Sequence, residues 1–440
     1  MSDTAPERLS HRRVLNIAIP VVLSNATVPI LGAVDTFVVG QMGLAAPIGA
    51  VGIGAVILSA FYWVFGFLRM GTVGLTAQAD GQGDAGEVAA LLTRALMIGL
   101  GAGVVIIALQ GLLFWVAFQV SPASVEVEGL AQQYMAVRVW SAPAAIALYG
   151  IMGWLIAQER THAVLVLQLW MNGLNIVLDL WFVMGLGWGV QGVAFASAIA
   201  EWSGFALGLW FCRAVFAGTA WRAWNSVLDA ARWRRMVGVN TDILIRSLLL
   251  QAIFVSFMLL GAGQGDVTLA ANQVLIQFLM IASYALDGFA FSAEALVGKA
   301  AGARNVVRLR RSAVLVWGWG MVSAAVLAVT FALFGGLIVE RMTTAPEVRE
   351  IARIYLPYLV VLPLIGCTAF ILDGIFVGAI RSRDMRNMMA VSFCVYVGCV
   401  LVLEPALGNH GLWLSMLISF VVRAATLAAR YPALERAAAQ

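Results

Sequence analysis

Four aspartates stand inside long apolar runs of this sequence, where an ionised side chain is costly. They are Asp35, Asp179, Asp287 and Asp373. On insertion scales an ionised acid near a helix centre costs about 2.5 to 3.5 kcal/mol, and burial favours the protonated form of a carboxyl group. A cation bound nearby favours the charged form again, so such an acid can exchange a proton for a cationic substrate. The four acids therefore indicate ion-coupled transport, although each could also serve only to hold helices together.

Asp179 has the most polar neighbourhood of the four. Asn175 precedes it by one helical turn in NGLNIVLDLW, so an amide and a carboxyl group share one face of an apolar helix. Glu294 follows Asp287 by two turns and can extend its polar face, but its place near a span end favours a structural role. Glu201 also lies close to a span end, and we expect it to be solvated.

Other polar residues of the apolar runs have simpler interpretations. Asp242 and Arg246 are four residues apart in one run, and we expect them to neutralise each other. Pro20 and Pro29 lie in the first run, where each removes a helix hydrogen bond and favours a kink. Pro20 lies about four turns before Asp35, so a bend there is a candidate hinge.

Composition places these residues in a membrane. The chain has 440 residues, of which 62% are hydrophobic and only 11% charged, against about 25% charged in soluble domains; its mean hydropathy is +0.92. The apolar runs are about 20 residues long, the length a helix needs to cross the hydrocarbon core. We predict spans near 14–39, 47–70, 91–118, 130–156, 163–186, 191–214, 236–260, 268–294, 312–338, 351–379, 387–406 and 411–429.

The distribution of charged residues between the spans indicates the membrane topology. The net charge is +4, but Lys and Arg are scattered between the spans and do not form one basic face, so no nucleic-acid partner is expected. The loops GQMGLAAP, SPASVEVEG, GLGWGVQG and GAGQGD contain no Lys or Arg, whereas most of the alternate loops do. The pattern predicts both termini in the cytoplasm. The four cysteines lack the spacing of a metal site or a disulfide framework.

An internal repeat divides the chain in two. Landmark residues recur 221 positions apart, namely Gly40 and Gly261, Gly81 and Gly302, Tyr134 and Tyr355, and Gly153 and Gly374. We predict an all-α integral membrane protein with twelve transmembrane helices in two pseudo-symmetric six-helix bundles. Residues 1–220 form the first lobe, 221–235 an interfacial linker and 236–440 the second lobe, and the two lobes are parallel repeats.

The ordered set of motifs resembles the multidrug and toxic compound extrusion (MATE) transporters, in their DNA-damage-inducible (DinF) branch. The motifs include LNIAIPVVLSNATVPILGAVDTFVVGQMG, AQADGQGD, SYALDGFAFSAEALVGKAAGAR and LDGIFVGAIRSRDMRN. The resemblance implies two bundles in a V that opens alternately to either side. It implies a protonatable Asp35 with polar neighbours Asn175, Asp179 and Ser197, a bend at Pro20, and acidic positions at Asp287 and Asp373 in the second lobe.

The resemblance also implies an activity. A transporter of this kind is no enzyme and needs no cofactor; it exports cationic or amphipathic drugs in exchange for protons, with Na⁺ the less favoured coupling ion. We expect a monomer surrounded by lipid in the cytoplasmic (inner) membrane.

Two other functions are compatible with parts of the sequence. A lipid-linked oligosaccharide flippase of the same superfamily would need basic residues in its cavity, and Arg246 is the only deep candidate that the spans suggest. An intramembrane aspartyl protease is suggested by GQGD at 81–84 and 263–266, but both copies lie in predicted loops.

Overall fold

The first half of the chain is a series of apolar helices with short irregular turns. A computed structural model describes residues 10–41, 45–120 and 124–439. Its helices up to the linker are α1 (His11–Ala26), α2 (Val28–Gly40), α3 (Ala45–Trp63), α4 (Phe67–Gly81), α5 (Ala85–Ala108), α6 (Gln110–Val120), α7 (Val125–Arg138), α8 (Ala142–Ala157), α9 (Thr161–Asp179) and α10 (Gly189–Phe211). Residues 1–9, 42–44 and 121–123, on which part of the predicted charge pattern rests, lie outside the described residues.

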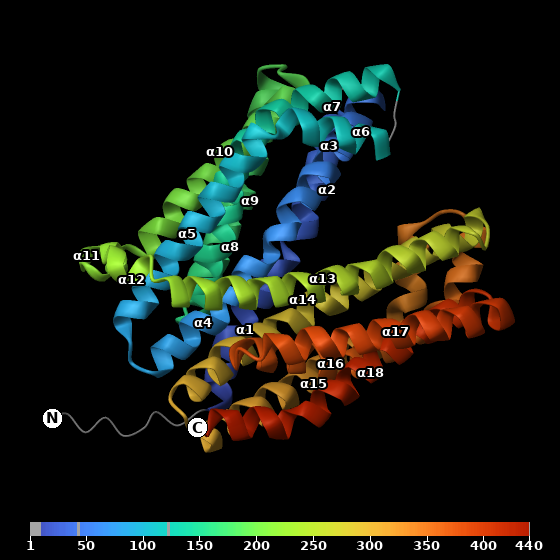
Figure 1. The fold of residues 1–440 in the computed structure, drawn as a ribbon. Helices are drawn as coiled ribbons and strands as arrows, with labels where there is room; N and C mark the ends of the chain where they lie inside the picture. The colour runs from blue at the N-terminus through green and yellow to red at the C-terminus, as the bar shows by residue number, and fades with distance from the viewer. Residues whose placement is uncertain (1–9, 42–44, 121–123, 440) are drawn as a thin grey trace. The chain divides into compact units, whose positions relative to one another are not determined.

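The second half has fewer and longer helices. After the linker helices α11 (Arg213–Ala217) and α12 (Trp224–Val227) come α13 (Ala230–Ala262), α14 (Asp266–Gly302), α15 (Val306–Met342), α16 (Pro346–Gly378), α17 (Ser382–Leu407) and α18 (Asn409–Ala438). Figure 1 shows α14, α16, α17 and α18 lying lengthwise beside one another. By length and composition, the described residues contain twelve candidate membrane spans. The predicted all-helical membrane fold is confirmed.

The helices form two compact units. The N-terminal unit comprises Leu23–Thr76 and Asp84–Arg234, and the C-terminal unit comprises 235–439 together with 10–22 and 77–83. The boundaries of these units differ from the predicted lobes, which follow chain order. The first turns of α1 and the end of α4 belong with the second half, and the linker belongs with the first.

The predicted repeat is visible in backbone contacts of the C-terminal unit. Gly81 lies against Lys299 so closely that a Cβ would meet its carbonyl oxygen, and Gly302 lies in the same way against Gln78. Gln78 and Lys299 are themselves 221 residues apart. The contact is therefore reciprocal, as expected where two equivalent helix ends cross near a pseudo-twofold axis.

A second pair of contacts repeats once in each unit. Gly153 on α8 lies against the carbonyl oxygen of Arg69 on α4, and Gly374 on α16 lies against that of Ala290 on α14. Both the glycines and their partners are 221 residues apart. Residues 221 positions apart thus make equivalent backbone contacts in the two units, and the predicted repeat is confirmed.

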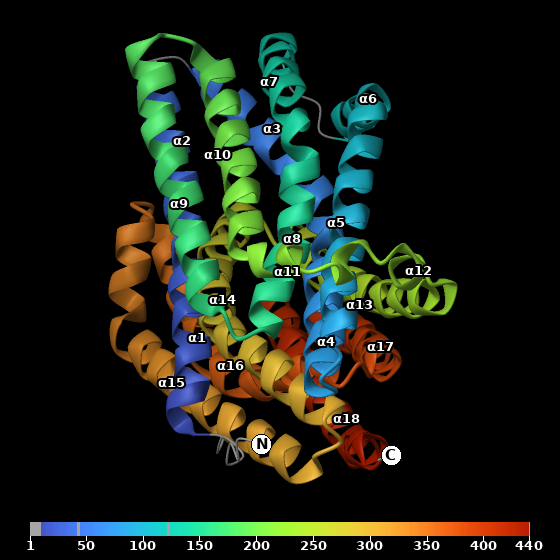
Figure 2. The ribbon, with the colours of Figure 1, turned by 90° about the vertical axis from the view of Figure 1, so that its left-hand side faces the viewer.

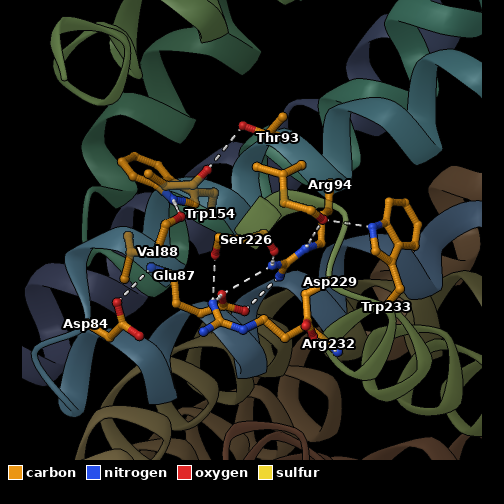
Figure 3. A network of polar contacts seen from close by, with 12 residues as sticks. Asp84, Glu87, Val88, Thr93, Arg94, Trp154, Ser226, Asp229, Arg232 and Trp233 are labelled. Carbon is orange, nitrogen blue, oxygen red and sulfur yellow. Dashed lines mark hydrogen bonds and ion pairs between the residues drawn. The ribbon is translucent and has the colours of Figure 1, made fainter. Parts of the chain in front are cut away.

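The linker is fastened to α5 by a buried arginine (Figure 3). Arg94 is completely buried, forms an ion pair with Glu87 at 2.7 Å and donates to the carbonyl oxygens of Ser226 (2.7 Å) and Val227 (2.9 Å). Arg232 reaches the other oxygen of Glu87. Arg94 lies in the span predicted at 91–118 and is a deep basic residue that was not among those expected from the sequence.

Candidate functional site

A polar face runs along α9 for three turns. Gln168, Asn172, Asn175 and Asp179 follow one another at spacings of three or four residues, which places them on one side of the helix. Gln168 donates to Asn172 Oδ1 at 3.0 Å, and Asn172 donates to Thr27 Oγ1 at 2.8 Å. The face predicted at Asn175 and Asp179 therefore extends to the first span.

Asn175 joins the two acids of the N-terminal unit. An asparagine amide is oriented by its hydrogen bonds, and one orientation satisfies both of its ends. In it the amide nitrogen donates to Asp179 Oδ2 at 3.1 Å and to Asp35 Oδ1 at 3.2 Å, while the amide oxygen accepts from the backbone N–H and the hydroxyl of Ser197 at 3.1 Å. Helices α2, α9 and α10, which carry these residues, lie side by side (Figure 2). The structure thus brings together Asp35, Asn175, Asp179 and Ser197.

The two carboxyl groups also contact each other. Asp179 is fully buried and Asp35 is half-buried, and their side chains lie close enough to interact directly. No donor of the described residues reaches Asp179 Oδ1, which is buried as well. Two ionised carboxylates have only acceptors to offer each other, so a hydrogen bond between them requires one proton. The geometry can hold one proton and can release it when a cation arrives.

Irregular turns border this carboxyl pair. The helix is interrupted at Thr27, a turn residue between α1 and α2 whose backbone angles stay in the α region. Helix α9 passes directly after Asp179 into a π-helical turn, Leu180–Gly185. Such turns are frequent at functional sites. Pro20 lies inside the continuous helix α1. The interruption comes seven residues later, two residues before Pro29, which has no backbone N–H to donate. The bend at Pro20 stays a prediction.

A buried ion pair that the sequence analysis missed lies beside the carboxyl pair. Arg138 on α7 binds Glu201 on α10 at 2.5 Å and donates to the hydroxyl of Tyr134 at 2.8 Å. Only 16% and 14% of the two charged side chains are exposed, so the expectation of a solvated Glu201 is wrong. Arg138 lies inside the span predicted at 130–156, and a basic residue at that depth was the signal that could have identified it.

In the C-terminal unit, Asp373 is already neutralised. It forms an ion pair with Arg246, and the guanidinium of Arg423 lies 3.6 Å away. Arg423 is 2% exposed and lies 5.5 and 5.1 Å from the ring centres of Phe370 and Phe420. Asp287 interacts electrostatically with Arg423, so the two acids predicted in this half share one charge cluster with two arginines.

Two expectations about basic residues are wrong. Asp242 does not neutralise Arg246, because it accepts hydrogen bonds from Arg386 (2.6 Å) and Ser382 (2.9 Å), and Arg246 binds Asp373 instead. Arg246 is also not the only deep basic residue. The further examples are Arg94, Arg138 and Arg423.

Glu294 is 1% exposed, and its predicted role stays a prediction.

The two GQGD motifs begin helices. Gly83 and Gly265 have φ values of 76° and 100°, which glycine adopts without strain. Asp84 caps α5 by accepting from the N–H of Glu87 at 2.9 Å, and Asp266 is the first residue of α14. Both aspartates therefore have positions typical of helix starts. Over the described residues, no group of three or more His, Cys, Asp or Glu could hold a metal ion.

Known proteins match this chain along most of its length. The MatE family profile matches residues 20–181 and 243–405, once in each half. DNA damage-inducible protein F of Escherichia coli K12 is 38% identical over 433 residues, which cover 96% of this chain and 92% of that protein. A probable multidrug resistance protein NorM of Xanthomonas campestris is 29% identical over 451 residues, covering 94% of this chain and 92% of that protein.

Solved structures show the same fold. The Vibrio cholerae MATE transporter VcmN in its bent form has a TM-score of 0.85 at 19% identity, with 97% of each chain covered. The doubled profile match and the 38% identical relative show more than the fold. The chain therefore belongs to the MatE family, whose members are transporters and not enzymes.

Proposed function

We propose that this protein exports cationic or amphipathic compounds in exchange for protons, and that Asp35 and Asp179 are the exchanging groups. The observation that carries the proposal is the contact between their two carboxyl groups, bridged by Asn175. This contact favours H⁺ over Na⁺ as the coupling ion, because only a proton makes a hydrogen bond between two carboxyl groups possible.

The exchange follows from charge. With one shared proton the pair carries a single negative charge, and after that proton leaves it carries two. A cationic compound is attracted more strongly to the doubly charged pair, and a returning proton weakens that attraction. A proton moving inward and a monovalent cation moving outward carry equal charge, so a one-for-one exchange is driven by the difference in proton concentration. That difference supplies about 1.4 kcal/mol per pH unit, which can drive export against a gradient. We place the protein in the cytoplasmic membrane as a monomer in contact with lipid, with both termini in the cytoplasm.

We assign coupling to the N-terminal unit rather than to the C-terminal acids. Asp373 is the counter-ion of two arginines. A proton or cation binding at that carboxylate would therefore compete with two fixed positive charges. We interpret Asp373 as a structural counter-ion, with Asp287 as part of the same cluster.

Flippase activity has less support. Recognition of a pyrophosphate needs arginines with free bidentate positions, whereas Arg94, Arg138 and Arg246 each form an ion pair with an acid. The fourth deep arginine, Arg423, lies 3.6 Å from the carboxylate of Asp373. A relative also points to drug transport, since NorM of Xanthomonas campestris is a probable multidrug resistance protein.

Purified protein in liposomes tests this function. A fluorescent cationic dye should move against its gradient when a proton gradient is imposed, and a protonophore should stop the movement. A sodium gradient alone should leave the dye in place, as in liposomes without protein. Movement driven by sodium alone would exclude proton coupling, and no movement under either gradient would exclude export of cations.

A further inference from the structure

The ion pair of Arg138 and Glu201 lies one helical turn from the proposed proton site. Ser197, which holds Asn175, and Glu201, which holds Arg138, are four residues apart on α10. Such residues lie on one face, separated by a rise of about 6 Å. Helix α10 contacts α2, α7 and α9, so it connects the helices that carry all the charged groups of this region.

Few charged or titratable groups face Arg138. They are the carboxyl groups of Asp35 on α2, Asp179 on α9 and Glu201 on α10, and the hydroxyls of Tyr134 on α7 and Tyr62 on α3. Tyr134 accepts from the guanidinium, and Tyr62 donates to the backbone carbonyl of Arg138 at 3.4 Å. Glu201 also faces the hydroxyl of Tyr149 on α8, on which Arg69 on α4 acts in turn. Among the described residues that face Arg138, the full charges are therefore up to three carboxylates.

The ion pair leaves some of its hydrogen-bonding capacity unused. Nε of Arg138 and Oε2 of Glu201 are buried, and neither has a partner among the residues described. Arginine stays charged under all ordinary conditions. Its field therefore acts on the carboxyl pair through a medium that screens charge less than water does, and Glu201 offsets part of that field.

We propose that the ion pair of Arg138 and Glu201 sets the pH at which the Asp35–Asp179 pair releases its proton. Arg138 is the counter-charge that stabilises the deprotonated pair, and Glu201 weakens this stabilisation by neutralising part of the positive charge. Both are positioning residues, because they act on the substrate through the carboxyl pair. The inference rests on the proposed function, in which that pair exchanges its proton for a cation.

The two halves of the ion pair should have opposite effects. In Arg138→Gln the counter-charge is lost, so the pair keeps its proton to higher pH and cation binding begins at higher pH. In Glu201→Gln the guanidinium acts on the pair without opposition, so cation binding begins at lower pH. Each shift should be about one pH unit, the size that a nearby charge produces. With both substitutions the two effects oppose each other, and the midpoint should lie between those of the single variants.

The test is the binding of a fluorescent cationic dye to the full chain in detergent over a pH series. Arg138→Lys keeps the charge and should restore the wild-type midpoint. Arg222→Gln removes an arginine that is exposed on the linker, and the midpoint should stay unchanged. Size-exclusion chromatography identifies folded variants, and if Arg138→Gln does not fold, the downward shift in Glu201→Gln decides.

The outcomes separate this inference from the function on which it rests. Opposite shifts support it. The inference is overturned if the midpoints of both single variants stay at the wild-type value, or if both move in the same direction. In either case, pH-dependent binding by the wild type leaves the proposed function intact. Binding by the wild type that does not depend on pH contradicts both.

Discussion

Replacing Asp35 with asparagine should abolish the export of cationic compounds while the chain remains folded and membrane-inserted. The asparagine side chain has nearly the same shape and can still hydrogen-bond to Asp179, so the packing of α2 against α9 should survive. Its amide can donate to an ionised Asp179, so the variant holds no shared proton and has none to release when a cation binds. Resistance of an efflux-deficient host and dye export from vesicles should both fall to the level without protein.

A matched variant controls for the loss of one acid. Asp266 is exposed at the start of α14, and Asp266→Asn should export dye at the wild-type rate. Both variants should elute from size-exclusion chromatography as the wild type does. If Asp35→Asn still confers full resistance, then Asp35 is a structural residue and the mechanism proposed for this unit is wrong.

Replacing Asp373 with asparagine should instead damage the fold. The substitution removes the carboxylate that Arg246 and Arg423 share, and both guanidinium groups are buried. Removing one partner of a buried ion pair costs about 3 to 5 kcal/mol, because the remaining charge is left uncompensated. We expect a clearly lower thermal unfolding midpoint in detergent and a low yield of folded protein.

Asp384 offers the comparison for this prediction. It forms an ion pair with Arg381 at 2.8 Å, and the side chains are 20% and 36% exposed. A partly exposed pair of this kind, three residues apart at the start of α17, contributes about 0 to 1 kcal/mol, so Asp384→Asn should unfold close to the wild-type temperature. If Asp373→Asn is as stable as Asp384→Asn but does not transport, Asp373 is a functional acid, as the resemblance to other transporters first suggested.

The fold could be predicted because its causes are local. Apolar runs of about 20 residues require spanning helices, and the 221-residue register shows which helices are equivalent. The same register reappears as backbone contacts at Gly153 and Gly374, where a side chain would not fit. The interruption at Thr27 lies two residues before Pro29, where a kink was expected, whereas no proline or glycine marks the start of the π-helical turn after Asp179.

The candidate site could be predicted only in part. Asp179 and Asn175 share a helix face and were found from their spacing, and the resemblance added Asp35 and Ser197. The ion pairs depend on contacts between distant helices. Asp242 and Arg246 have the spacing of a helical ion pair, but Arg386 and Asp373 are their partners in the structure, since tertiary contacts outweigh a surface pair worth a few tenths of a kcal/mol.

The central claim is that one carboxyl pair exchanges a proton for a cation, and proton release on binding tests it most directly. Purified protein in weakly buffered detergent solution is mixed with a cationic dye, and the pH change is recorded with the bound dye. The wild type should release about one proton for each dye bound, since the pair holds one shared proton, and Asp35→Asn should release none. Dye binding by the wild type without proton release, or equal release by Asp35→Asn, would contradict the account.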